Sequence, residues 1–350
     1  MDKTKIVVVG PGLIGKQHIK LINENPNTIL AAIVAPNHEH NHQFSKKIQA
    51  PLFHDLDSCI RSVKLDGVMI SSPNKFHFEQ ASICIKQGIP VFIEKPITPS
   101  VQEAELLVNL VEKYQGKVLI GHHRAHSPLL AKAREIIQEG RLGRIVSITG
   151  SAQFYKPDSY FAAGPWRTQL GGGPILINLI HEIGILRSLC GEISAVHAFS
   201  SSNIRNFPVE DTVSINFSFK NGALGNFMLS DTAACARSWE QTSRENPAYP
   251  TYPDEDCYVV CGTLGSLSIP TFRLKYYKEK TSASWWNPFE EEILKIDRKD
   301  PLTCQLSHFV RVIQGIEEPL VSAKDGLQNL RVTEAISISA NENCTIFLQN

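Results

Sequence analysis

The glycine-rich stretch Gly10-Pro11-Gly12-Leu13-Ile14-Gly15 constrains the fold of this chain more than any other feature. It follows the apolar run Lys5–Gly10 and opens Leu13–Asn23, whose pattern predicts a helix. In a G-x-G-x-x-G turn between strand and helix, the first glycine permits the sharp turn. The second lets the backbone approach a pyrophosphate, and the third lets helix and strand pack closely. The helix N-terminus adds N–H donors and a positive dipole end. We therefore predict a dinucleotide site formed by Gly10, Gly12, Leu13, Ile14 and Gly15.

The first third of the chain alternates short apolar runs with helical patterns. The predicted strands are Lys5–Gly10, Ile29–Ala35, Gly67–Ser72, Pro90–Glu94 and Lys117–Gly121, and the predicted helices are Leu13–Asn23, Phe78–Gln87 and Gln102–Tyr114. Strands that alternate with helices indicate βαβ units and a mostly parallel sheet covered on both faces. Residues 1–122 are therefore predicted to form a doubly wound Rossmann domain that binds a dinucleotide.

Beyond Gly121 strand follows strand, which indicates an α+β domain over residues 123–350 with a large, mainly antiparallel sheet. The predicted strands are Ile145–Phe154, Ala195–Ser200, Thr212–Phe219, Ala223–Ser230, Asp256–Val260 and Ser266–Ile269, and the helices are Pro128–Glu139, Pro174–Leu189 and Leu327–Ala340. Asn221-Gly222 between two strands is a hairpin signal. The last helix, about 327–340, is placed so that it can pack back on the first domain. An open sheet face also favours a homodimer or homotetramer.

Length and composition exclude several classes of protein. A chain of 350 residues is long enough for two domains. Lys plus Arg and Asp plus Glu both total 35, which gives no electrostatic reason to expect nucleic acid or an anionic membrane as a partner. No run approaches the ~20 apolar residues of a membrane span. The predicted first strand also leaves no room for a signal peptide, so a cytoplasmic protein is expected.

Eight cysteines are scattered along the chain, and none forms a CxxC pair. This spacing argues against a disulfide framework and against zinc, and it favours a reducing compartment. We expect no metal site, and we expect the cysteines to serve as small buried apolar residues.

Further coenzyme contacts are predicted at the ends of two strands. The second strand ends in Ala35, Pro36 and Asn37, which include neither the acidic residue typical of NAD sites nor an arginine for a 2′-phosphate. NAD is favoured because no Arg or Lys is adjacent, and NADP stays possible. Ser71, Ser72, Pro73 and Asn74 end another strand, where ligands of doubly wound sheets bind, although a plain turn would look the same. His77 either caps the next helix or faces the nicotinamide.

Two short motifs carry the predicted chemistry. Glu94-Lys95-Pro96 places a lysine just past a strand, and Asn178-x-x-His181 places an amide and an imidazole one helical turn apart on the same face. The alternative interpretations are a solvated surface lysine and a core histidine. The polar pair interrupts the very apolar sequence ILINLIHEIGIL, which favours a functional role for Asn178 and His181.

With these motifs the chain resembles the glucose–fructose oxidoreductase / inositol dehydrogenase / MocA family over essentially its whole length. The resemblance rests on GPGLIG, SSPNKFH, EKP, GHHRAH at Gly121–His126 and GGGPILINLIHEIGILRSL. It implies an N-terminal Rossmann domain and a C-terminal domain with a large, mainly antiparallel sheet. It also implies dimers or tetramers built on that sheet, and oxidation of sugars, cyclitols or related polyols.

Carried over residue by residue, the resemblance assigns Lys95 as the catalytic lysine and His181 as the catalytic histidine. Glu94 would shape the nicotinamide pocket, and the Lys95–Pro96 peptide is often cis in relatives. His123 and Arg124 lie near where relatives place coenzyme or substrate contacts. The sequence departs from the family at Asn178 and Ala35, where many members have aspartate, and at Ala125, where relatives often carry arginine.

Oxidation of a secondary alcohol requires a base for the hydroxyl proton while hydride leaves the same carbon. The imidazole of His181 suits this task because its ordinary pKa of ~6.5 lies near neutral pH. Lys95 can donate a hydrogen bond to the developing alkoxide, and Asn178 is expected to bind a substrate hydroxyl. Tyr155, Trp166 and Arg167, together with Lys156 and Tyr160, lie between a strand and the histidine helix, and we expect substrate contacts there, with plain packing as the alternative.

The predicted function is therefore hydride transfer between NAD(P) and a secondary hydroxyl of a sugar, cyclitol or polyol. Two alternatives are an NAD-dependent enzyme that cleaves glycosides by transient oxidation and elimination, and a non-catalytic regulator that binds NAD(P). The turn-rich segment Arg237–Asp256 is predicted to be neither strand nor helix. It is a surface loop, a lid over the substrate or an oligomer contact.

Overall fold

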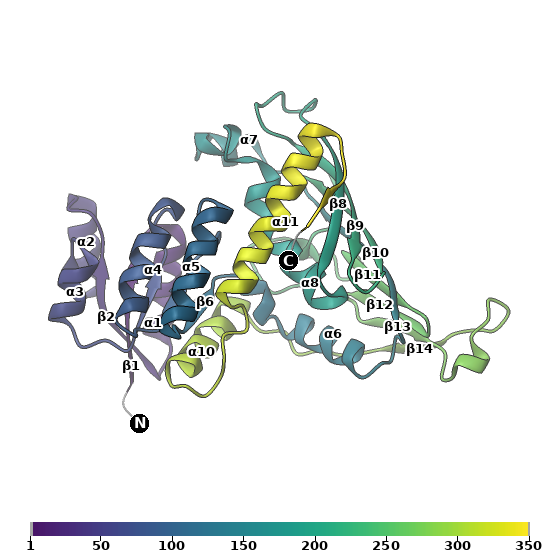
Figure 1. Cartoon of the computed structure of the whole chain (residues 1–350), viewed down its shortest axis with the longest axis horizontal. Helices are drawn as coiled ribbons and strands as arrows, with labels where there is room; N and C mark the ends of the chain where they lie inside the picture. Colours follow the sequence, from purple (N-terminus) through teal and green to yellow (C-terminus); the bar gives the residue numbers. More distant parts are fainter. Residues whose placement is uncertain (1–2, 349–350) are drawn as a thin grey trace. The chain divides into compact units, whose positions relative to one another are not determined.

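The computed structural model describes residues 3–348, which divide into two compact units (Figure 1). Unit 1 contains the chain up to His126 together with Pro301–Leu330, and unit 2 contains Ser127–Asp300 and the chain from Arg331 onward. The sequence predicts one domain over residues 123–350, whereas Pro301–Leu330 group with the first unit. Each unit is therefore built from two separate stretches of sequence.

Unit 1 is a six-stranded parallel sheet with helices around it, in the strand order β3-β2-β1-β4-β5-β6. The strands are β1 Thr4–Val9, β2 Thr28–Val34, β3 Leu52–Phe53, β4 Gly67–Ile70, β5 Val91–Ile93 and β6 Val118–Ile120. The helices are α1 Leu13–Glu24, α2 Glu39–Ile48, α3 Leu56–Ser62, α4 His77–Lys86, α5 Val101–Tyr114 and α10 Pro301–Ile313. Ile6, Val68 and Ile93 are fully buried, as expected for strands covered on both faces. The predicted Rossmann fold is confirmed.

Four elements of unit 1 were not predicted from the sequence, and three of them are short or largely polar. Helix α2, with the sequence EHNHQFSKKI, is almost entirely polar, and its half-buried Phe44 and Ile48 pack against the core. Strand β3 has two residues, and α3 has seven. Helix α10 is strongly amphipathic, but it lies far along the sequence from the rest of unit 1, and its role in that core depends on tertiary contacts.

Unit 2 is a nine-stranded mixed sheet in the order β14-β13-β12-β11-β7-β10-β9-β8-β15. Only β7 and β10 pair in parallel, so the predicted, mainly antiparallel sheet is confirmed. Its strands are β7 Ile145–Gln153, β8 Ile193–Ser201, β9 Thr212–Phe219, β10 Leu224–Ser230, β11 Tyr258–Gly262, β12 Gly265–Ile269, β13 Arg273–Tyr276, β14 Glu290–Ile293 and β15 Ile346–Phe347. The helices are α6 Pro128–Gln138, α7 Asp158–Ala162, α8 Ile180–Cys190, α9 Trp239–Thr242 and α11 Ala323–Glu342, which begins in unit 1. The predicted Asn221-Gly222 turn joins β9 to β10, with Gly222 at φ 87°.

The predicted helix Pro174–Leu189 has two parts with different geometry. Ile175–Leu179 form a π turn, and the α-helix α8 begins only at Ile180. A π turn bonds i to i+5 instead of i to i+4 and occurs mostly as a single turn, often at functional sites. Asn178 lies inside this turn, and His181 lies in the first turn of α8.

The sequence predicts neither a membrane-spanning helix nor a disulfide framework. No helix of residues 3–348 is long and apolar enough to cross a membrane. All eight cysteines are free, and four of them, Cys59, Cys84, Cys190 and Cys257, are buried. Burial raises the pKa of the Cys84 thiol to about 12, as expected for a small apolar core residue.

Candidate functional site

The three glycines of the first turn lie in different structural environments. Gly10 has φ 82°, and a Cβ there would lie 2.6 Å from the Ser72 backbone. A Cβ on Gly15 would lie 2.1 Å from the carbonyl oxygen of Gly10, so close packing of helix on strand requires glycine at both positions. A Cβ on Gly12 would meet no atom within 4 Å. The backbone at Gly12, which caps α1 without a side-chain hydrogen bond, is open to a ligand and fits a coenzyme pyrophosphate.

A cavity of about 340 Å³ lies beside this turn, at the carboxyl ends of β1, β2 and β4. Of the predicted coenzyme contacts, Gly10, Ala35, Pro36, Ser72 and Pro73 line it. The lining contains three acidic residues, Asp55, Asp57 and Glu79, and no Lys or Arg. The cavity therefore offers a nucleoside no cationic partner for a 2′-phosphate.

Other predicted coenzyme residues do not line this cavity. Leu13 is 89% exposed at the start of α1, an unusual place for a large apolar side chain. The side chain of Asn37 is paired with His42 at 2.7 Å. Ser71, which is buried, follows β4 directly. Ile14 lies in the first turn of α1, and Asn74 begins the short 3₁₀ helix Asn74–Phe76.

Glu94 is a buried carboxylate held by a histidine, His18, that was not among the predicted site residues. Its Oε1 lies 2.8 Å from Nε2 of His18 on α1, and its Oε2 accepts a hydrogen bond of 3.1 Å from the backbone N–H of Lys95. Burial raises the pKa of Glu94, but the His18 hydrogen bond and the nearby Lys95 charge outweigh it and hold the pKa below its ordinary value. His18 lies three residues after Gly15, and this spacing was the available signal.

Lys95 follows β5 and is half-buried, and the peptide that joins it to Pro96 is cis. His77 connects this segment to the SSPN segment. Its Nδ1 lies 2.9 Å from the Pro96 carbonyl oxygen, and its Nε2 lies 2.9 Å from the Ser72 carbonyl oxygen. Burial lowers the pKa of His77, although both carbonyls favour the protonated ring. His77 therefore ties together two segments that were predicted separately to contact coenzyme.

His123 and Arg124 lie in the 3₁₀ helix His123–His126 that follows β6. Arg124 is buried. His123 as a whole residue is half-buried, but its ring lies among protein atoms. This burial and the Arg124 charge lower the pKa of His123 to about 3, while Glu94 opposes the shift. His123 is therefore neutral at neutral pH.

In unit 2 a buried polar cluster surrounds Asn178. The Nζ of Lys156 donates a 2.7 Å hydrogen bond to Asn178 Oδ1 and lies 3.5 Å from an oxygen of Asp231. The other Asp231 oxygen accepts a 2.8 Å hydrogen bond from Nε of Arg205. Burial lowers the pKa of Lys156, whereas the charge of Asp231 opposes that shift. Arg205 and Asp231 come from a loop and from the residue after β10, and no motif in the sequence marked them.

Only some of the aromatic and basic residues that were predicted to contact substrate pack against this cluster. Tyr155 and Trp166 are 58% and 57% exposed. The Arg205 guanidinium lies 5.2 Å from the Tyr155 ring, which joins Tyr155 to the cluster. Arg167 stacks 3.9 Å from the Tyr160 ring and donates to the Tyr160 carbonyl oxygen. Arg167 therefore has an evident structural role.

His181 is buried at 9% exposure. The next residue, Glu182, accepts a hydrogen bond from the Tyr258 hydroxyl and so fixes the start of α8 against β11. Lys95 belongs to unit 1 and His181 to unit 2. The meeting of these two side chains at one substrate stays a prediction.

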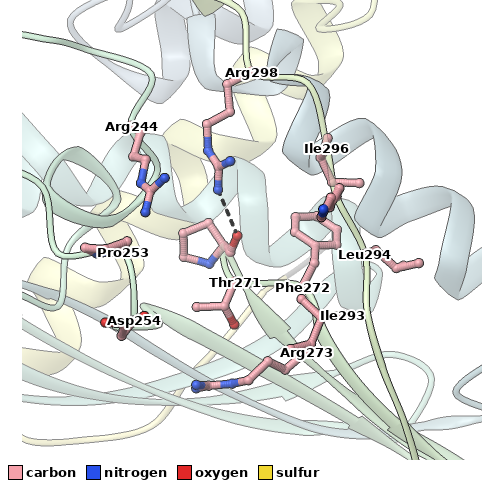
Figure 2. A pocket seen from close by; sticks show the side chains of 12 residues that line it. Arg244, Pro253, Asp254, Thr271, Phe272, Arg273, Ile293, Leu294, Ile296 and Arg298 are labelled. Carbon is pink, nitrogen blue, oxygen red and sulfur yellow. Dashed lines mark hydrogen bonds between the residues drawn. The ribbon is translucent and has the colours of Figure 1, made fainter.

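The loop Arg237–Asp256 contains one helical turn, α9, so the expectation of no helix there was wrong. Ser238 caps this turn, and Trp239 is buried with its Nε1 donating to Glu245. Arg244, Pro253 and Asp254 of this loop line part of a cavity of about 450 Å³ (Figure 2). Arg298, which also lines it, donates a hydrogen bond of 3.5 Å to the Pro270 carbonyl oxygen. None of the predicted site residues lines this cavity, and the lid and oligomer-contact hypotheses stay open.

Comparisons with known proteins agree with this description. The family profile "Oxidoreductase family, NAD-binding Rossmann fold" matches residues 4–122, and "GFO/IDH/MocA C-terminal domain" matches residues 130–268. The chain is 26% identical to 1,5-anhydro-D-fructose reductase of Ensifer adhaerens over 78% of this chain and 76% of that protein. It is 25% identical to myo-inositol 2-dehydrogenase of Thermotoga maritima over 99% and 98%.

A solved structure shares the whole fold. The WlbA dehydrogenase from Bordetella pertussis, crystallised with NADH and UDP-GlcNAcA, aligns over 99% of both chains with a TM-score of 0.77 and 21% identity. The two profiles together cover most of the chain and include both units, and they confirm the resemblance, the fold class and the NAD coenzyme expected from the sequence. The chain belongs to the GFO/IDH/MocA family of NAD-dependent oxidoreductases.

Proposed function

We propose that this protein transfers a hydride between NAD and a secondary hydroxyl of a sugar, cyclitol or related polyol. The names of two relatives, an anhydrofructose reductase and a myo-inositol dehydrogenase, support this substrate class. The single observation that carries the proposal is the open backbone at Gly12, next to two glycine positions that packing makes obligatory. That arrangement suits a pyrophosphate.

The protein's own residues would hold the substrate and manage the proton, while bound NAD supplies the hydride acceptor. Lys95 would donate a hydrogen bond to the alkoxide, and Glu94, fixed by His18, would hold the segment that carries it. His181 would accept the hydroxyl proton, and Asn178 would bind a neighbouring substrate group. This proposal requires Lys95 of unit 1 and His181 of unit 2 to reach the same substrate.

We propose NAD in preference to NADP as the working coenzyme. The cavity beside the glycine turn has three carboxylates in its lining and no Lys or Arg. A 2′-phosphate there would meet like charges without a cationic partner, which is unfavourable. The 2′-hydroxyl of NAD would instead meet acceptor groups.

We further propose that the protein is a cytoplasmic homodimer or homotetramer that associates through the sheet of unit 2. Large apolar side chains are exposed on its strands, among them Phe199 on β8 at 55% and Leu224 on β10 at 62%. Such residues on an open sheet favour association with a second copy. Sedimentation at micromolar concentration tests this, and a monomer would contradict it.

The decisive experiment measures reduction of NAD and NADP against a panel of sugars, inositols and hydroxy acids. We expect turnover with NAD on at least one of them, and loss of two or more orders of magnitude in kcat for Lys95→Ala and His181→Ala. NADH binding and the melting temperature should survive in both variants. Wild-type rates in both variants on a good substrate would refute the assignment.

A further inference from the structure

One hydrogen bond fixes the direction in which the Asn178 amide faces a ligand. The Nζ of Lys156 lies 2.7 Å from Oδ1 of Asn178. A lysine ammonium has three N–H donors and no acceptor, so the carboxamide must turn its oxygen, and not its nitrogen, toward Lys156. The amide NH₂ then faces away. Among residues 3–348 no acceptor takes either of its hydrogens, and Asn178 is only half-buried.

The lysine that sets this orientation is itself fixed. Its side chain is 9% exposed and lies 3.5 Å from Asp231, whose other oxygen is bound by Arg205 at 2.8 Å. The Lys156 ammonium also lies 5.0 Å from the centre of the Tyr160 ring. Movement of Lys156 away from Asn178 would leave a buried carboxylate with one cation fewer, which is costly. The buried cluster therefore holds Lys156 in place, and Lys156 sets the orientation of the Asn178 amide.

We propose that Lys156 is a positioning residue that makes Asn178 a hydrogen-bond donor toward the substrate. A donor at that place selects a substrate with a carboxylate or carbonyl oxygen there over one with a hydroxyl alone, because charged acceptors form the stronger hydrogen bonds. This inference rests on the proposed function and narrows its substrate class to acid or keto derivatives of sugars and polyols.

Equilibrium binding to the NADH complex tests the inference with two probes that differ in one group, D-glucuronate and D-glucose. We expect the wild type to bind glucuronate about tenfold more tightly, the effect of one charge-assisted hydrogen bond. Asn178→Asp replaces the NH₂ with an oxygen and should remove or reverse the preference. Lys156→Met frees the amide to rotate and should reduce the preference severalfold, whereas Lys156→Arg, which is also only a donor, should retain most of it.

Lys278→Met serves as the matched control because Lys278 is 70% exposed and pairs with Glu290 in unit 2. It should leave the preference unchanged. Full preference in a folded Lys156→Met protein, or no preference or no binding in the wild type, would overturn the inference. The proposed function is judged separately by NADH affinity and by Lys95-dependent turnover. A protein that binds NADH and turns over neutral polyols without favouring acids would contradict this inference alone.

Discussion

The coenzyme turn of unit 1 and the polar cluster of unit 2 are built in opposite ways. The turn uses backbone, because three glycines within six residues leave one face open and pack the other against Ser72. The cluster uses polar side chains from separate segments, since Lys156, Asn178, Arg205 and Asp231 are spread between positions 156 and 231. The first kind of site depends on local spacing, and the second depends on the folded sheet.

This difference predicts how each site responds to substitution. A side chain added at Gly12 should alter ligand binding while the fold survives, because a Cβ there would meet no protein atom within 4 Å. Changes in the cluster should alter folding and ligand selectivity together, because its charges are buried against one another.

The largest effect is expected for Gly12→Val. Its side chain would enter the open space at the turn and exclude a pyrophosphate, so NADH affinity should fall at least ~100-fold, or about 2.7 kcal/mol. Fluorescence titration with NADH measures the loss, and a thermal melt should show a normal fold. Gly15→Ala offers the contrast, since its Cβ would collide with the Gly10 carbonyl oxygen and should lower the melting temperature itself. Normal NADH binding by Gly12→Val would contradict the assignment of the turn.

A middle-sized effect is expected for Asp231→Ala. The substitution leaves Lys156 and Arg205 buried without their shared carboxylate, so the free energy of unfolding should fall by ~3 kcal/mol in urea. Glu255→Ala is the control because the Arg237–Glu255 pair is about half exposed, and its loss should cost less than ~1 kcal/mol. Equal losses in the two variants would show that the cluster is not the buried network described above.

The sequence revealed the coenzyme side of the molecule better than the substrate side. The Rossmann sheet, the glycine turn and the hairpin at Asn221-Gly222 follow from local spacing, and the structure contains all three. Arg205 and Asp231 could not be identified, because an arginine in a loop and an aspartate after a strand are ordinary until the sheet brings them together. His18 and the helix α2 were missed for related reasons: a lone histidine and a polar helix carry little periodic signal.

The smallest effect is expected in the pH dependence of the stability that His77 contributes. Burial lowers the pKa of His77 below its ordinary value of 6.5. As the pH falls below 6.5, His77 is therefore protonated in the unfolded chain before it is protonated in the folded chain. The stabilisation is complete above pH 6.5 and is lost as the pH falls, by at most ~1.4 kcal/mol per pH unit. The stability advantage of wild type over His77→Asn should therefore shrink between pH 7.5 and pH 5.5 in paired urea titrations. An advantage that stays constant or grows would contradict the direction of this shift.

The π turn at Ile175–Leu179 has a consequence for the chain's tolerance of length changes. Such a turn holds one residue more than a regular α turn, so deletion of a single residue there could yield an uninterrupted α-helix. Every side chain before the deletion would then rotate by ~100° relative to those after it. The helical content would survive, yet the amide of Asn178 would leave Lys156. Deletion of one residue would thus replace the present arrangement of Asn178 and Lys156 with a regular α-helix in which the two no longer meet.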